Sequence, residues 1–119
     1  MRDTYLKYDF LVLFPGGYRV RDLYNDNTDV YIVFKNDFST VFVTTLFTTE
    51  NINQIMRNNK ESFFWASDML ILDNLSRETI YMSIDKIIKT DHLSLNNLFC
   101  IAGSYSEVFD CENIIYDLL

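Results

Sequence analysis

Few residues of this chain could support chemistry: its 119 residues include one histidine, two cysteines and three glycines. His92 is the only side chain whose ordinary pKa lies between pH 5 and 8. It follows a helical pattern, where the helix dipole favours a cation, and we predict this structural role. General-base catalysis by His92 in a small enzyme is the alternative, although the local sequence places no nucleophile beside it.

The two cysteines do not form a disulfide framework or a metal centre. Cys100 lies in the apolar run 98–102 and Cys111 occupies an apolar position of the last segment, so we predict two reduced core thiols. One histidine and two cysteines cannot supply the four ligands of a structural zinc site. We therefore expect no catalytic residue and no metal.

The polar stretch 25–29 carries oxygen-bearing side chains at alternate positions, as calcium loops do. A calcium loop would need glycine at the sixth position, which is Val30, and a bidentate acid at the twelfth, which is Asn36. We predict a polar turn instead. The glycines match neither phosphate-binding spacing, so we expect no cofactor and no small-molecule ligand; they are Gly16, Gly17 and Gly103.

Acidic residues outnumber basic ones by 17 to 10, giving a net charge of −7. Such a chain repels nucleic acid and anionic lipid, and its field speeds encounter with a basic protein. The acids gather in two groups: Asp22, Asp26 and Asp29 in the first, and Glu107, Asp110, Glu112 and Asp117 in the second. Two interpretations are open: a solvated surface, or an acidic face that covers the basic groove of a nuclease. For the second interpretation we favour the later group, because a helix would present it rigidly.

Composition predicts a folded chain, with 49% hydrophobic and 23% charged residues, and we expect one domain over 1–119. The first third is rich in aromatic and β-branched residues and is divided by turn signals at 15–17 and 35–37. Polar residues 25–29 separate the second predicted strand from the third. The predicted strands are 5–14, 18–23, 30–34 and 39–48.

Helical spacing follows. Thr48 or Thr49 caps a short predicted helix with the stripe Ile52, Ile55 and Met56, and Ser76 caps a longer one. The longer helix has apolar residues at 80, 84, 87 and 88, and a third predicted helix spans 106–119. Strands are predicted at 63–72, with a possible break at 67–68, and at 98–102. This order favours an α+β fold, with about three helices on one face of a mainly antiparallel sheet.

Trp65 is the only tryptophan and lies beside Phe63 and Phe64. We predict a core strand here, in preference to an exposed recognition patch. Consecutive aromatic residues cannot all face one way, so an edge position would offer aromatic surface to a partner.

The beginning of the chain does not resemble a signal peptide. Charges at Arg2, Asp3, Lys7 and Asp9 interrupt any apolar h-region. The longest apolar runs, 10–14 and 30–34, are far shorter than a membrane span. We expect a cytoplasmic protein without a membrane partner.

The stretch from Phe64 to Ile80 runs from an aromatic pair through an acid and an aliphatic strand into a capped helix. It resembles the small acidic immunity proteins that bacteria carry beside polymorphic or contact-dependent growth-inhibition toxins. The resemblance implies a cytosolic inhibitor that binds one cognate toxin domain, often a nuclease. It implies no functional residues, because those families share none.

Two other classes of function are open. A phage-encoded inhibitor of a host defence nuclease would use the same acidic mimicry, and a small enzyme would use His92. An upstream toxin gene would favour the immunity protein, a phage operon would favour the second class, and loss of activity in His92→Ala would favour the third.

Overall fold

The first three strands form antiparallel pairs in which apolar side chains alternate between two faces. The computed structural model describes residues 7–91 and 100–103. Strand β1 (Phe10–Leu13) pairs with β2 (Asn27–Phe34), which pairs with β3 (Asp37–Thr48). The β2–β3 register sets Val30 against Thr44 and Ile32 against Phe42, with an irregularity near Val33. The predicted turn between these two strands is confirmed.

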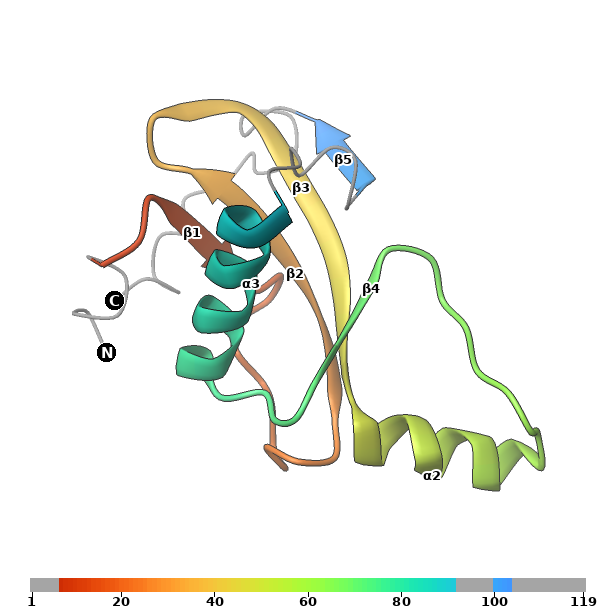
Figure 1. Cartoon of the computed structure of the whole chain (residues 1–119). Coiled ribbons are helices and arrows are strands. Elements are labelled where there is room, and N and C mark those ends of the chain that lie inside the picture. The colour runs from red at the N-terminus through yellow and green to blue at the C-terminus, as the bar shows by residue number, and fades with distance from the viewer. Residues whose placement is uncertain (1–6, 92–99, 104–119) are drawn as a thin grey trace.

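The other edge of β3 is shared by two short strands. Strand β4 (Met69–Leu72) runs parallel to the end of β3, and β5 (Cys100–Gly103) runs antiparallel to its first half. A parallel neighbour needs a crossover, and the chain makes it through helix α2 (Thr49–Asn59) and the segment after it (Figure 1). The α+β class is confirmed for the described residues. Their sheet is mixed: three pairs are antiparallel and β3–β4 is parallel.

Helix α3 (Arg77–Asp91) covers one face of the sheet and completes the main core (Figure 1). Its N-cap is Ser76 as predicted, since the backbone N–H of Thr79 donates to Ser76 Oγ at 3.1 Å. Tyr81 stacks on Phe10 with ring centroids 5.5 Å apart. Ile80 and Ile84 of α3 are also fully buried. The predicted apolar stripe therefore faces the sheet.

The opposite face carries a smaller core of Leu13, Val33 and Val41, all fully buried. Helix α2 covers neither face: it continues beyond the end of β3 and contains no buried residue (Figure 1). The expectation that the helices all pack on one face is thus wrong for α2. Its N-cap is Thr48, one of the two predicted caps, and it ends at Lys60, whose φ of 57° is left-handed.

Three predicted segments need correction. Residues 18–23 form no strand, because the nearby acids bond to the backbone there and compete with a sheet ladder. Asn27–Asp29 belongs to β2 and not to a loop. Of the predicted strand 63–72 only Met69–Leu72 forms, and Asp68 before it has a φ of 52°. The predicted helix 106–119, His92 and Cys111 lie outside the described residues.

Candidate protein-binding surface

The first acidic group is built around Asp26, whose carboxylate holds its own loop in shape. Asp26 Oδ2 accepts the backbone N–H of Arg21 at 3.1 Å, and Oδ1 accepts that of Asn27 at 2.8 Å. Both oxygens therefore have protein donors, and the side chain is half-buried. Asp26 works as an anchor of the segment 21–26, which we call the Asp26 loop.

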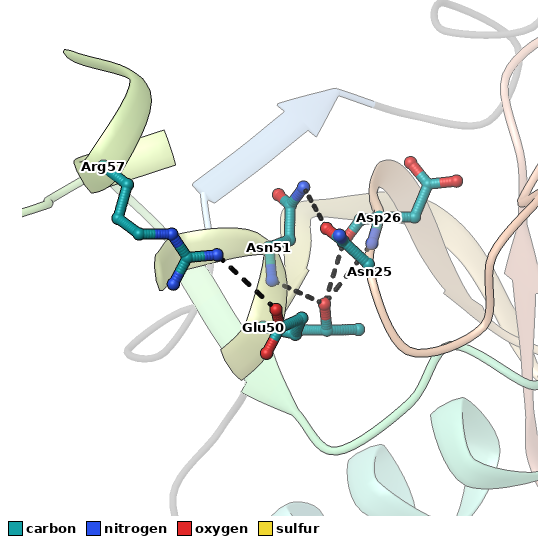
Figure 2. A network of polar contacts seen from close by, with 6 residues as sticks. Asn25, Asp26, Glu50, Asn51 and Arg57 are labelled. Carbon is teal, nitrogen blue, oxygen red and sulfur yellow. Dashed lines mark hydrogen bonds and ion pairs between the residues drawn. The ribbon is translucent and has the colours of Figure 1, made fainter. Parts of the chain in front are cut away.

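Thr48 joins this loop to the start of α2. Its hydroxyl oxygen accepts the backbone N–H of Asn51 at 3.1 Å, which caps the helix, and that of Asp26 at 3.3 Å (Figure 2). The Thr48 N–H in turn donates to the Asp26 carbonyl at 3.2 Å. Because Thr48 is fully buried, water cannot replace these contacts, and the loop and the helix start are one unit.

Asparagine side chains extend this contact across the surface. Asn51 Nδ2 donates to Asn25 Oδ1 at 3.2 Å (Figure 2), and Asn27 Nδ2 donates to Asn51 Oδ1 at 2.9 Å. Further along α2, Arg57 lies 3.6 Å from Glu50 (Figure 2). That ion pair is exposed and contributes little to stability. The asparagines add specific links between the Asp26 loop, β2 and α2.

Asp22 and Asp29 differ from Asp26 because both are exposed. Asp22 Oδ1 accepts the N–H of Tyr24 at 3.0 Å, and Asp29 Oδ1 accepts the hydroxyl of Thr45 at 2.7 Å. Each carboxylate is thus oriented by one internal donor and still faces solvent. Of the three predicted binding residues in this group, Asp22 and Asp29 are exposed, whereas Asp26 is engaged within its own loop.

The start of α3 fixes the other side of the loop. The Leu75 N–H donates to the Leu23 carbonyl at 2.8 Å, and the Tyr18 hydroxyl donates to the Leu75 carbonyl at 2.6 Å. The Arg77 guanidinium carbon lies 4.7 Å from the Tyr18 ring centroid. Burial raises the pKa of Tyr18, while Arg77 lowers it and Asp26 raises it further. The Leu23–Leu75 contact thus links the Asp26 loop to the residues just before α3.

The aromatic stretch before β4 is on the surface. Trp65 is 73% exposed and Phe63 is 60% exposed, so the predicted core strand is wrong for these residues. Phe64, between them, packs against Phe47 with ring centroids 5.0 Å apart. Aromatic residues are enriched in strands, so composition favoured a strand at 63–65, where the structure forms none.

The described residues offer no cluster for metal chemistry: within 7–91 and 100–103, no three His, Cys, Asp or Glu side chains gather around a common point. The Asp26 carboxylate, in the stretch compared above with a calcium loop, is engaged by backbone N–H groups. Neither α2 nor α3 is long and apolar enough to cross a membrane.

The second acidic group, Glu107, Asp110, Glu112 and Asp117, lies outside the described residues, so its role stays a prediction. No family model, curated protein or solved structure matches this chain. The case for its function therefore depends on its own residues.

Proposed function

We propose that this chain is a non-catalytic inhibitor that binds and neutralises a cognate protein toxin domain, a nuclease with a basic surface, through an acidic face. This is the role of the small acidic immunity proteins that the sequence resembles. The observation that carries the proposal is the pair of exposed, internally oriented carboxylates at Asp22, in the loop held by Asp26 and Thr48, and at Asp29, on the neighbouring strand β2.

Orientation matters because binding orders side chains at a cost in free energy. A carboxylate already positioned by a hydrogen bond loses less conformational freedom when a lysine or arginine approaches. A nuclease groove binds phosphates through basic side chains. Carboxylates held in fixed positions can bind the same side chains. The excess of 17 acids over 10 bases would also speed the encounter.

The second acidic group has a part in the same proposal. The segment 104–119 holds four acids and no base, so it adds strongly to the negative field. We infer that its residues at 107, 110, 112 and 117 contribute more to affinity than the Asp26 loop does. The protein would act in the cytoplasm, without cofactor, nucleic acid or membrane as a partner.

Purification of the partner tests the proposal. Tagged full-length chain is recovered from its native host, and the protein bound to it in equimolar amount is identified and isolated. We expect a nuclease whose activity is abolished by one equivalent of this chain, while the chain alone hydrolyses neither DNA nor RNA. Nuclease activity that persists at saturation of the complex would contradict the proposal.

Charge variants then locate the contact. We expect a larger loss of affinity from E107Q/D110N/D117N than from D22N/D29N, because the first set removes more of the charge. Amide replacements suit Asp22 and Asp29 because the amide oxygen can still accept from Tyr24 and Thr45. A larger loss from D22N/D29N would show that the main contact is made by Asp22 and Asp29 instead.

A further inference from the structure

The segment Glu61–Asp73, which we call the aromatic segment, exposes an unusual amount of apolar surface. Trp65 is 73% exposed, Phe63 60% and Ile71, on β4, 48%. Scattered exposed apolar residues are ordinary, but three within one short segment, two of them aromatic, indicate a site of interaction. Tryptophan is also the residue most enriched among those that dominate binding energy.

The aromatic segment is held at both ends and in the middle. At its start, the Glu61 N–H donates to the Met56 carbonyl of α2 at 2.9 Å. At the start of β4, the Asp68 carbonyl accepts the Thr45 N–H at 3.2 Å and the Thr44 hydroxyl. Between these points Phe64 packs against Phe47. Trp65 is therefore presented on an anchored loop, which lowers the entropy lost when it enters a pocket.

Charge indicates what kind of partner fits. Residues 61–76 contain three acids and no base, and the acids Glu61, Asp68 and Asp73 are all exposed. The nearest bases in the chain lie on either side: Lys60 caps α2, and Arg77 lies over the Phe14 and Tyr18 rings. The acids nearest to Phe63 and Trp65 in the sequence, Glu61 and Asp68, are exposed and can pair with lysine or arginine on a partner.

The sheet connects this surface to the exposed carboxylate of Asp29 on β2. The strand register places Asp29, Thr45 and Met69 in one row across β2, β3 and β4. Neighbouring strands are about 4.8 Å apart, so Asp29 and Met69 are roughly 10 Å apart at the backbone. Ile71 shares the face of Met69, two residues further along β4. One partner surface of ordinary size can contact both regions.

We propose that Trp65 and Phe63 are the apolar anchors of the interface and enter a pocket with a basic rim on the partner protein. This inference depends on the proposed function and adds a second source of binding affinity, separate from the acidic residues. The acids set the rate of encounter, whereas the aromatic anchors set the lifetime of the complex. The occupant is a basic protein and not a second copy of this acidic chain.

The test places a photo-activated cross-linking amino acid at position 65 of the full-length chain in its native host. The matched control carries the same group at Met82, a similarly exposed residue of α3. We expect an adduct at 65, and none at 82, with a protein of net positive charge. The isolated protein should bind Trp65→Ala and Phe63→Ala about 30-fold or more weakly than the parent chain, through faster dissociation.

The outcomes separate this inference from the proposed function. An adduct only with another copy of the chain, equal adducts at both positions, or a loss below about fivefold in Trp65→Ala would overturn the role of the aromatic segment. In those cases weaker binding by D22N/D29N would leave the proposed function intact. Absence of any bound partner would overturn both. Unchanged thermal unfolding of Trp65→Ala verifies that the variant folds.

Discussion

The acids of the first group have different roles, because Asp26 holds the loop whereas Asp22 and Asp29 face solvent. Both carboxylate oxygens of Asp26 accept hydrogen bonds from backbone N–H groups. Asp22 and Asp29 each accept one hydrogen bond through one oxygen and remain exposed. A mutation of all three together would mix a change of charge with a change of loop structure. Separate variants are needed to assign binding.

The first prediction separates these roles through stability. Asp26→Ala removes the acceptor of two backbone N–H groups, and we expect a loss of about 1–2 kcal/mol in the free energy of unfolding. The control D22N/D29N keeps its acceptors and should change that free energy by less than about 0.5 kcal/mol. Urea denaturation measures both. Equal losses in the two variants would show that Asp26 is no anchor.

A second prediction concerns Tyr18, whose hydroxyl donates to the Leu75 carbonyl. Tyr18→Phe removes this hydrogen bond and should lower stability near pH 7 by about 0.5–1.5 kcal/mol. The pKa of Tyr18 is raised in the folded state, mainly by burial, so the folded chain binds this proton more tightly than the unfolded chain. The contribution is therefore complete below the ordinary pKa of 10.0 and is lost as pH rises through the folded-state pKa.

The measurement compares the unfolding free energies of the parent chain and Tyr18→Phe from pH 7 to pH 11. Their difference should shrink as the pH rises above about 10, because the ionisation of groups that both proteins share contributes equally to the two free energies and cancels. A difference that stays constant or grows would mean that the ionisation of Tyr18 is not linked to folding.

At the scale of elements, α3 is joined to the edge of the sheet by a polar contact inside the core. The Val12 N–H on β1 donates to the Tyr81 hydroxyl at 2.8 Å, and both residues are buried. Edge strands carry backbone groups without a strand partner, and here a helix side chain satisfies one of them.

A third prediction follows for Tyr81→Phe. The substitution keeps the ring stacked on Phe10 and leaves the buried Val12 N–H without this acceptor. We expect a loss of about 1–3 kcal/mol in unfolding free energy. Amide hydrogen exchange should show faster exchange at Val12 than in the parent chain. Unchanged stability and exchange would show that this contact is dispensable.

Elements with a strong periodic or compositional signal were predictable from sequence. The β-branched and aromatic residues of β2 and β3 specified strands, and the isoleucine stripe of α3 specified a helix with one buried face. Residues 18–23 and 63–68 were mispredicted because side-chain hydrogen bonds and a left-handed residue decided their backbone. The Asp26–Thr48 contact joins residues far apart in sequence, so no local pattern encodes it.

At the scale of the whole molecule, the chain has a net charge of −7 and one tryptophan, so tryptophan fluorescence reports on the proposed interface alone. A fourth prediction is that Trp65 emits like a solvated tryptophan and is quenched readily by acrylamide. Relative to a free tryptophan derivative, caesium should quench it more efficiently and iodide less, because acids attract the cation and repel the anion. Both differences should fade with added salt. Blue-shifted emission insensitive to acrylamide would contradict the exposure of Trp65.

The central claim is that an acidic face recognises a basic protein, and the association rate tests it most directly. Stopped-flow rates with the isolated partner should be high at low salt and fall steeply with ionic strength, while dissociation changes less. We expect D22N/D29N to slow association and E107Q/D110N/D117N to slow it further, with Trp65→Ala affecting mainly dissociation. Recognition through an acidic face would be contradicted if the association rate did not depend on salt concentration and were unchanged in both charge variants.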